Sequence, residues 1–371
     1  MTTDTTYVIA GASLAGAKAA ETLREEGFDG PLILIGAETE RPYERPPLSK
    51  DYLLGKAERE TIYVHPPQWY AEHDVDLRLG VTVTGIDPAA HEVSLADGSR
   101  AGYSKLLLAT GSSPRRLSVP GAGLDGVLYL RSVGDCDQIK AALQGASRVA
   151  VIGGGIGLET TAAARAAGVE VTVLEMSELP LLRVLGRQVA QVFAGLHREH
   201  GVDLRCGVQI SEITGSGGTA TGVRLADGRH AEADAVIAGV GITPSSQLAA
   251  AAGLHVDNGI RVDAQLRSSD PDIYAAGTSP TPSTPCWAST SGSSTGPTRC
   301  VSRRPRPRRC SARTSPTTGC RTSSPTSTTW AWNTPAMSSP TATTRSSSAA
   351  TPASASSSPS GSEPAGESWP G

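Results

Sequence analysis

The last quarter of the chain lacks most of the side chains that build a folded core. The 94 residues that follow Gly277 contain no Leu, Ile, Phe, Tyr, Asp or Lys. A segment of this composition cannot bury enough apolar surface to offset the conformational entropy lost on folding. We therefore expect residues 278–371 to be disordered, and we look for a function in residues 1–277.

Cysteine is scarce in residues 1–277, where Cys136 and Cys206 are far apart and belong to no Cys-x-x-Cys pattern. This scarcity argues against a zinc site built on paired cysteines and against a redox disulfide, because both need paired sulfur atoms. The sequence also has no apolar run long enough to cross a bilayer and no signal-peptide pattern at its start. We therefore expect a cytoplasmic protein without membrane contact.

Basic residues are in deficit within residues 1–277. The whole chain has 33 Lys and Arg against 36 Asp and Glu, and nine of the Arg but only two of the Glu follow Gly277. The first 277 residues therefore have 24 basic and 34 acidic side chains, a net charge of −10. This balance argues against nucleic-acid binding, which needs clustered Lys and Arg on a folded domain.

A glycine-rich turn follows the first apolar run of the chain and precedes an Ala-rich segment that we predict to be a helix. Gly11 permits a tight turn, the small Ser13 lets a pyrophosphate approach the backbone, and Gly16 lets the helix pack closely on the strand. Glu38, about 20 residues further on, can accept hydrogen bonds from the ribose hydroxyls of an adenosine. An ordinary strand-to-helix connection is the alternative. The predicted dinucleotide site comprises Gly11, Ser13, Leu14, Ala15, Gly16 and Glu38.

A second glycine-rich turn begins at Gly153, again between a β-branched run and an Ala-rich helical segment. Glu175 ends the next apolar run, where its carboxylate would bind both ribose hydroxyls and repel a 2′-phosphate, which favours NAD(H) over NADP(H). Gly153 and Gly155 have the expected spacing, but Gly157 comes one residue early. One missing residue rotates the start of the helix by about 100°, which puts the affinity for the nicotinamide coenzyme in doubt.

Four further segments of the sequence sharpen this interpretation. They are residues 41–50 (RPYERPPLSK), 106–115 (LLLATGSSPR), 239–244 (GVGITP) and 272–277 (DIYAAG). Together with the two turns, they resemble the flavin-dependent ferredoxin reductases, which form the putidaredoxin and rubredoxin reductase branch of the pyridine nucleotide–disulfide oxidoreductase superfamily. The likeness runs in order from Tyr7 to Gly277, and the ordered set of motifs is far more specific than any one of them.

The resemblance implies an α/β fold with two nested three-layer, Rossmann-like domains. Residues 1–112 and 244–277 would form an FAD domain, with residues 113–243 inserted as an NAD(H) domain. In such proteins the first turn holds the FAD pyrophosphate, Glu38 its adenosine ribose, and Lys50 lies near the isoalloxazine. A solvated surface amine is the alternative for Lys50. The other cofactor-binding residues that the resemblance and the second turn indicate are Arg45, Ala109, Thr110, Gly111, Gly153, Gly155, Gly157, Glu159, Glu175, Gly241 and Gly277.

The resemblance also implies a route for electrons. Disulfide reductases of the superfamily have a Cys pair beside the flavin, and this sequence has none after Leu48. A hydride would pass from NADH to FAD, and single electrons would leave for a ferredoxin-type iron–sulfur protein that serves an oxygenase. The alternatives are an NADH oxidase, the flavin module of nitrite reduction, or an NADH-binding flavoprotein similar to apoptosis-inducing factor. Hydride transfer needs no general acid or base, so we assign no catalytic residue and expect surface positions for His65, His73, His197 and His200.

The resemblance breaks off after Gly277. Family members continue with an Asp that binds the ribityl chain of FAD, whereas this chain has Thr278. Reading the codons from Gly277 onward one base earlier allows a sequence that restores both the Asp and a Trp-containing segment expected beside the flavin. We therefore hypothesise a frameshift that leaves the chain as written poorly able to retain FAD; a genuine Ser/Thr/Pro-rich linker is the alternative. Resequencing tests this, since an intact frame through Gly277 would contradict it.

Overall fold

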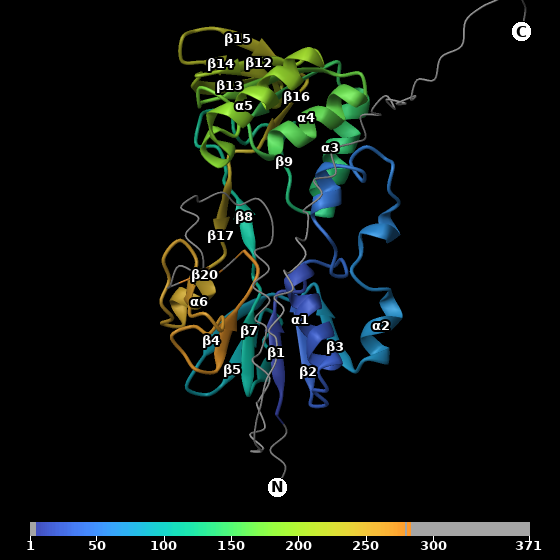
Figure 1. Ribbon diagram of the computed structural model, residues 1–371, viewed down its shortest axis with the longest axis vertical. Helices are drawn as coiled ribbons and strands as arrows, with labels where there is room; N and C mark the ends of the chain where they lie inside the picture. The colour runs from blue at the N-terminus through green and yellow to red at the C-terminus, as the bar shows by residue number, and fades with distance from the viewer. Residues whose placement is uncertain (1–4, 279, 283–371) are drawn as a thin grey trace, which may run out of the picture. The chain divides into compact units, whose positions relative to one another are not determined.

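The computed structural model of the chain describes residues 5–278 and 280–282, which Figure 1 shows as ribbons. The expectations of a disordered tail and of a frameshift concern residues that, apart from Thr278 and residues 280–282, lie outside this part of the chain.

The first of two parallel sheets has five strands in the order β19-β7-β1-β2-β3. Its central strands are short apolar runs, as expected for strands that are covered on both faces. Because all five strands are parallel, their carboxyl ends lie at one edge of the sheet. The strands are β1 (Tyr7–Ala10), β2 (Leu32–Gly36), β3 (Val75–Leu79), β7 (Lys105–Leu108) and β19 (Ile273–Ala275).

Two different layers cover this sheet. Ile9 of β1 packs in one core cluster with Ala20 of helix α1 (Leu14–Glu25). Its neighbour Val8 points to the opposite face and packs in another cluster with Val93 of an antiparallel sheet, because successive side chains of a strand alternate between faces. The strands of the antiparallel sheet are β4 (Val83–Asp87), β5 (Glu92–Leu95) and β6 (Arg100–Gly102).

The second parallel sheet repeats this arrangement, with the order β12-β11-β10-β16-β9. Val149 and Val151 of β10 pack with helices, whereas Ala150 and Ile152 pack with a second antiparallel sheet. The parallel strands are β9 (Val127–Tyr129), β10 (Arg148–Ile152), β11 (Glu170–Glu175), β12 (Asp203–Cys206) and β16 (Ala235–Ala238). The covering elements are α3 (Val133–Gly145), α4 (Ile156–Ala166), α5 (Leu182–Glu199), β13 (Ile210–Ser216), β14 (Thr219–Leu225) and β15 (His230–Glu232).

The chain crosses between the two sheets twice, and the two crossing segments pair with each other. Strand β8 (Ser112–Pro114) is antiparallel to β17 (Ile242–Pro244), with Ser112 opposite Pro244. The predicted α/β fold class with two nested three-layer units is confirmed, and the predicted domain boundaries near residues 112 and 244 stay predictions. The remaining elements are η1 (Pro46–Ser49), η2 (Arg59–Ile62), α2 (Pro67–Glu72), α6 (Gln247–Ala251), β18 (Ile260–Val262) and β20 (Pro280–Pro282).

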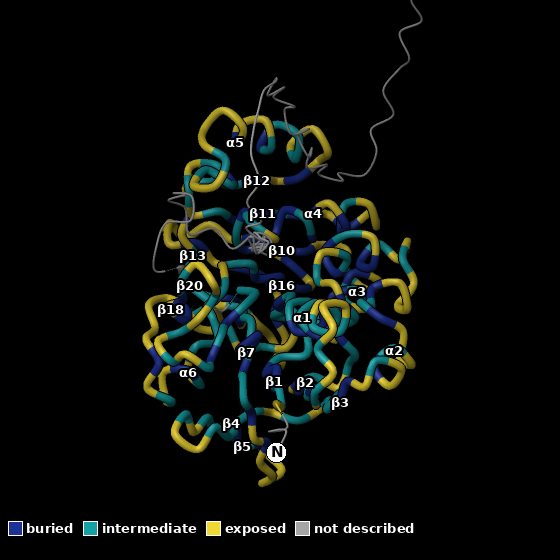
Figure 2. Tube along the Cα trace, turned by 60° about the horizontal axis from the view of Figure 1, so that its bottom comes forward, coloured by how far each residue is buried: buried dark blue, intermediate teal, exposed yellow. Residues whose placement is uncertain are grey.

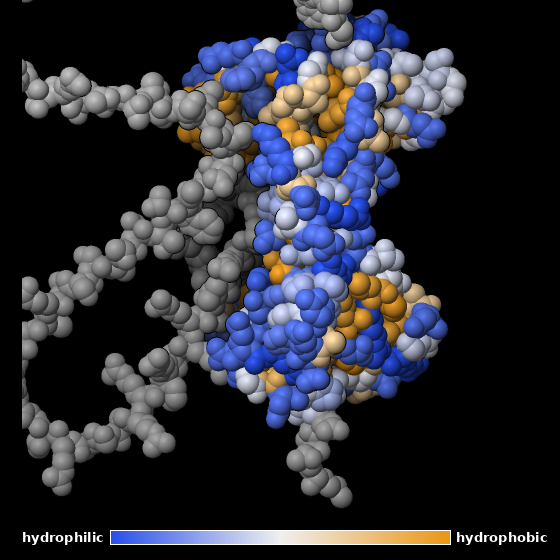
Figure 3. All heavy atoms as spheres, turned by 90° about the vertical axis from the view of Figure 1, so that its right-hand side faces the viewer, coloured by the Kyte–Doolittle hydropathy of each residue, from blue (hydrophilic) through white to orange (hydrophobic). Residues whose placement is uncertain are grey.

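Apolar side chains are concentrated inside the layers. Strands β10 and β16 are buried over almost their whole length (Figure 2). The face shown in Figure 3 is mainly hydrophilic, with two groups of hydrophobic side chains separated by a hydrophilic band. No helix of the described residues has both the length and the apolar character needed to cross a bilayer. The exposed large apolar side chains of this part are Ile156, Met176, Val184, Val189, Val192 and Val256.

The expectation that His65 lies at the surface is wrong. His65 is only 8% exposed, and its ring stacks on the ring of Trp69 at a centroid distance of 3.8 Å. His73 stacks on Trp69 at 4.4 Å and is half-buried, as is His197, whereas His200 is exposed as predicted. Stacking on α2 supplies a buried environment that the sequence pattern around His65 did not indicate.

Burial of His65 is expected to make stability fall in mild acid. Burial lowers the pKa of His65, although Glu21 opposes the shift, and its Nε2 has no hydrogen-bond partner. The unfolded chain therefore binds a proton from about pH 6.5 downward, before the folded chain does, so stability is full above this pH and is lost as the pH falls toward the folded value. We expect the free energy of unfolding in urea to fall between pH 7.5 and 5.5, and His65→Phe to reduce this fall.

Burial also lowers the pKa of His197, so part of the pH dependence should remain in the His65→Phe variant. His255→Asn, at another exposed histidine, is the matched control and should leave the fall in stability unchanged. An undiminished fall in the His65→Phe variant would show that His65 does not contribute.

Candidate functional site

The first glycine-rich turn leaves β1 and enters α1 with almost no space between backbone segments. Gly11 has a φ of +124°, and a Cβ atom built on it would lie 2.1 Å from the carbonyl oxygen of Ala109. A Cβ on Gly16 would lie 2.1 Å from the carbonyl oxygen of Gly11. Both positions therefore require glycine. Ser13 is the N-cap of α1, but its side chain forms no capping hydrogen bond with the first turn of the helix.

Three other predicted residues lie beside this turn. Ala109, buried at the end of β7, donates its amide to the carbonyl of Ala10 at 2.8 Å. Gly277 follows β19 with a φ of +88°, and a Cβ on it would lie 3.2 Å from the Cβ of Ala15. The carboxyl ends of β1, β7 and β19 thus bring Gly11, Ala15 and Gly277 together, as expected for a parallel sheet.

Glu38 follows β2 and is held by two side chains of the segment that comes after it. The hydroxyl of Tyr43 donates to Oε2 of Glu38 at 2.5 Å, and Nη2 of Arg45 donates to Oε1 at 2.9 Å. Burial raises the pKa of Tyr43, which keeps this hydroxyl protonated as a donor. Arg45 also donates to the backbone carbonyl of Arg131. The predicted Glu38 and Arg45 are therefore direct partners.

Arg131 is a candidate that the sequence analysis missed. Its Nε is buried without a hydrogen-bond partner, and its Nη2 lies 3.2 Å from the position of a Cβ on Gly111. Burial, and then the neighbouring charge of Arg45, lower the pKa of Arg131 to about 10. Two guanidinium groups next to one carboxylate, that of Glu38, favour the binding of an anion such as a phosphate. A single Arg after a short apolar run carries no sequence signal for such a site.

The second glycine-rich turn shares the close backbone approach of the first turn at its first glycine but differs at its last. Gly153 has a φ of +101°, and a Cβ on it would lie 2.4 Å from the carbonyl oxygen of Gly239. A Cβ on Gly155 would meet no atom within 4 Å, so the backbone there is open to a ligand. Gly157 is the second residue of α4, whereas Gly16 is the third residue of α1, and a Cβ on Gly157 would lie 2.8 Å from Cγ1 of Val151. The closely packed glycine is therefore shifted by one helical position.

Glu175 closes this second turn. It ends β11, and its two carboxylate oxygens accept hydrogen bonds from the amides of Gly154 at 2.5 Å and Ser177 at 2.7 Å. Gly241, also at the carboxyl side of this sheet, has a φ of +103° and accepts a hydrogen bond from the amide of Arg115 at 2.9 Å. The predicted residues of the second turn thus lie at the carboxyl ends of β10, β11 and β16.

Side chains connect the predicted residues near the first glycine-rich turn with those near the second. Nζ of Lys50 lies 2.9 Å from Oε2 of Glu159, the fourth residue of α4. The hydroxyl of Ser49 donates to the same oxygen. Thr110 donates to the carbonyl of Ser245 at 2.7 Å, and Gly111 accepts from the amide of Ser245 at 2.9 Å, so both belong to the crossing segments. Lys50 is thus paired with a carboxylate while 38% of its side chain is exposed, and its place beside a flavin stays a prediction.

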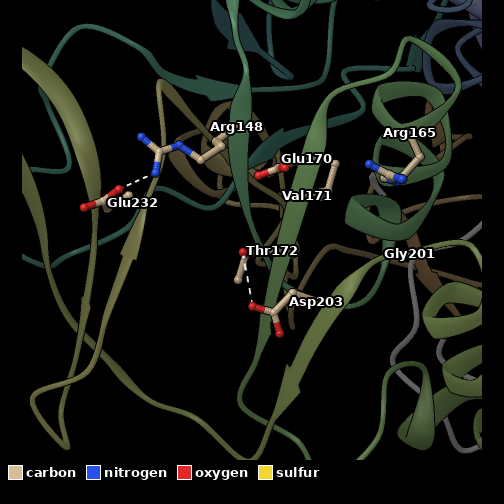
Figure 4. A pocket seen from close by; sticks show the side chains of 8 residues that line it. All are labelled: Arg148, Arg165, Glu170, Val171, Thr172, Gly201, Asp203 and Glu232. Atoms are coloured by element: carbon tan, nitrogen blue, oxygen red, sulfur yellow. Dashed lines mark hydrogen bonds and ion pairs between the residues drawn. The ribbon is translucent and has the colours of Figure 1, made fainter.

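One cavity of the described residues lies away from both turns. It has a volume of about 320 Å³ and is found where β10, β11 and β12 begin, at the opposite edge of the second sheet. Its polar side chains bond to one another (Figure 4), as in the pairs Arg148 with Glu232 and Thr172 with Asp203. No predicted site residue lines it, so we place the candidate site at the glycine-rich turns. Within the described residues, no group of three or more His, Cys, Asp or Glu is arranged to hold a metal ion.

Known proteins match about three quarters of this chain. Residues 5–284 match the family model described as pyridine nucleotide-disulphide oxidoreductase. The chain is 43% identical over 271 residues to rhodocoxin reductase of Rhodococcus erythropolis, covering 73% of this chain and 64% of that protein. It is 41% identical over 283 residues to putidaredoxin reductase of Pseudomonas putida, covering 75% of this chain and 67% of that protein.

A third relative is the ferredoxin–NAD(+) reductase component of the anthranilate 1,2-dioxygenase system of Burkholderia cepacia, which is 43% identical over 275 residues, covering 73% of this chain and 67% of that protein. A solved structure of the covalent complex of putidaredoxin reductase with putidaredoxin superimposes with a TM-score of 0.74 at 40% identity, over 76% of this chain and 69% of that chain. The chain spans about two thirds of the length of these relatives.

Proposed function

Because this chain belongs to the pyridine nucleotide-disulphide oxidoreductase family, we propose that it is a flavoprotein that takes a hydride from NADH and passes single electrons to a ferredoxin-type iron–sulfur protein. The observation that carries this proposal is the placement of two glycine-rich turns at the carboxyl ends of two parallel sheets, linked through Lys50 and Glu159. Two dinucleotide sites are needed where one coenzyme reduces another. A relative named as a component of a dioxygenase system supports an oxygenase as the final user of the electrons.

We propose that residues 1–112 and 244–277 hold FAD, together with Arg131 of the inserted segment 113–243. The residues present fit this group, because the buried Nε of Arg131 lacks an acceptor and Arg45 adds a second positive charge next to it. The pyrophosphate of FAD would offset these charges while the first glycine-rich turn, from Gly11 to Gly16, binds it through backbone amides. Glu38 would then accept the ribose hydroxyls, with Tyr43 and Arg45 holding its carboxylate.

We propose that the inserted residues 113–243 hold NAD(H). The open backbone at Gly155 accommodates a pyrophosphate, and Glu175 at the end of β11 would accept the ribose hydroxyls. Met176 is 76% exposed and Ile156 is 41% exposed, and each directly follows one of these residues. Their apolar surfaces at the edge of the turn suit the flat rings of a nucleotide. The negative charge of Glu175 favours NADH over NADPH.

Bound FAD supplies the exchange between two-electron and one-electron chemistry. The residues of this chain bind and orient the two coenzymes and exclude water. Lys50 and Glu159 join the segment that follows Glu38 to the helix that follows the second turn, so they hold the two sites next to each other. Both cysteines of the described residues are free, and Cys136 is buried, so they supply no disulfide step. We propose that the protein acts in the cytoplasm, where reduced thiols and NADH occur together.

The proposal is tested by mixing the full chain with FAD, removing the excess and measuring bound flavin. NADH oxidation is then followed with cytochrome c, with and without a small iron–sulfur ferredoxin. Ferredoxin-dependent reduction of cytochrome c supports the proposal. NADH oxidation that consumes oxygen without a ferredoxin favours the oxidase alternative, and slow turnover with a long-lived charge-transfer species favours the apoptosis-inducing-factor alternative. A chain that binds neither coenzyme even in the presence of saturating FAD contradicts all three.

The substitution Thr278→Asp is expected to tighten FAD binding about tenfold, because an ionised acceptor strengthens a hydrogen bond by about 1.5 kcal/mol or more. Thr278 lies beside the first site, with its Oγ1 3.4 Å from Oγ of Ser112 and 3.7 Å from the position of a Cβ on Gly111. A carboxylate there would also lie near the guanidinium group of Arg131, whose Nη2 is 3.2 Å from the same Cβ position. Titration of the apoprotein with FAD measures the affinity, and Thr278→Asn is the uncharged control. Equal affinities in all three proteins would contradict a role for this position.

A further inference from the structure

Ser49 belongs to none of the predicted roles, yet it contacts the side chain that links the two sites. It ends the 3-10 helix η1 and is only 3% exposed. Its hydroxyl donates to Oε2 of Glu159, and the carbonyl of Pro46 is a second acceptor at 3.3 Å. Lys50, the next residue, donates to the same carboxylate oxygen at 2.9 Å. Glu159 is thus held by two neighbouring donors from a segment 110 positions away in the sequence.

The segment that carries Ser49 is fixed by contacts that do not involve Glu159. Leu48 is 1% exposed, and its carbonyl accepts a hydrogen bond from Sγ of Cys136 at 3.1 Å. The hydroxyl of Tyr52 donates to Oδ1 of Asp137 at 2.8 Å. Both partners are on α3, which is a different helix from the one that carries Glu159. The serine hydroxyl therefore has a fixed position, from which it orients the carboxylate.

The ion pair alone is a weak constraint. The side chains of Lys50 and Glu159 are 38% and 36% exposed. Ion pairs between side chains of this exposure have small interaction energies, so they restrict the positions of the two groups only weakly. The buried hydroxyl of Ser49 loses less entropy on bonding than the long side chain of Lys50 does. We propose that Ser49 is a positioning residue, which holds Oε2 of Glu159 in place so that Lys50 stays paired at the junction of the two sites.

This positioning concerns only the chain's own residues, whereas its consequence for catalysis rests on the proposed function. If Lys50 lies beside the flavin, loss of the Ser49 hydroxyl should lower kcat for NADH oxidation about two- to fivefold, as expected for a contact of this exposure. The KM for NADH should change little, because Gly155 and Glu175, which are proposed to bind NAD(H), are not hydrogen-bond partners of Ser49. The test below uses a readout that needs neither coenzyme, so its failure is distinct from failure of the proposed function.

The reactivity of the Lys50 amine reports its pairing. An ammonium group held against a carboxylate is acylated more slowly than one that is free in solvent. The full-length chain is treated with a trace of acetic anhydride, and the labelling rate of each lysine is measured by peptide mass spectrometry. Lys105 is an internal control, because it is 39% exposed and is likewise paired with a carboxylate, that of Asp272.

In Ser49→Ala, we expect the labelling rate of Lys50 to rise about two- to fivefold while that of Lys105 is unchanged. Ser49→Thr, which keeps a hydroxyl, should restore the slow rate. Glu159→Gln should raise the rate of Lys50 at least as much, and adding Ser49→Ala to that variant should raise it no further. An unchanged Lys50 rate in Ser49→Ala, or a parallel rise at Lys105 that indicates general loosening, would overturn the inference.

Discussion

Gly11→Ala is expected to lower the free energy of unfolding strongly. A Cβ at this position would lie 2.1 Å from the carbonyl oxygen of Ala109 and 2.4 Å from its carbonyl carbon, and both are backbone atoms of a central strand end. They cannot move without breaking the pairing of β1 with β7. The cost adds steric overlap to the strain of a positive φ and amounts to about 3 kcal/mol or more. Circular dichroism during urea unfolding measures it.

Gly27→Ala is the matched control for Gly11→Ala. Gly27 also has a positive φ, of +84°, but a Cβ on it would meet no atom within 4 Å. Its substitution should therefore cost only the backbone strain, about 1 kcal/mol. If both variants lose the same stability, the close approach between β1 and Ala109 has no separate importance, and our account of the first turn is wrong.

Glu175→Ala is expected to weaken NADH binding about 100-fold. The proposed role of this carboxylate is to accept the ribose hydroxyls, and hydrogen bonds to a charged group contribute about 1.5 to 3 kcal/mol each, with tenfold in affinity for about 1.4 kcal/mol. The substitution also removes the acceptor of the amides of Gly154 and Ser177. The fluorescence of NADH on titration with the protein measures the affinity, and affinity for NADPH should fall less.

Asp234→Ala separates these two effects. The carboxylate of Asp234 likewise accepts two backbone amides, from Ser147 at 2.8 Å and Arg148 at 2.9 Å, which are at the start of β10 and so at the opposite edge of the same sheet. These hydrogen bonds, chiefly that from Arg148, lower the pKa of Asp234. Its loss should reduce stability while NADH affinity is retained. A similar loss of affinity in both variants would mean that Glu175 acts only by supporting the fold.

The sequence predicts the glycine-rich turns well, because the requirement is local. Gly11, Gly16 and Gly153 are close in sequence to the strands and helices that they connect, and steric exclusion of a Cβ leaves glycine as the only residue at each. Glu38 and Glu175 follow from the same local geometry, since each lies just past the strand that follows a turn. Spacing alone therefore indicates where the carboxyl ends of the strands meet.

The contacts between distant segments could not be predicted from sequence. Arg131 becomes a candidate only because folding places its buried guanidinium next to Arg45 and Gly111. The partner of Ser49 is 110 positions away, and no local pattern specifies it. The burial of His65 is only partly of this kind, since its ring stacks on the nearby Trp69 but also lies beside Glu21 of the distant helix α1.

The pairing of β8 with β17 constrains how the two sheets can move. The crossing strands are hydrogen-bonded in register, with Ser113 opposite Thr243, and the amide of Arg115 extends this ladder to Gly241. A slip of one residue would turn every side chain of one strand to the opposite face and break the ladder. Any hinge motion during a catalytic cycle must therefore bend the two strands together as one ribbon, and a proline or glycine introduced into either strand would alter the stiffness of both.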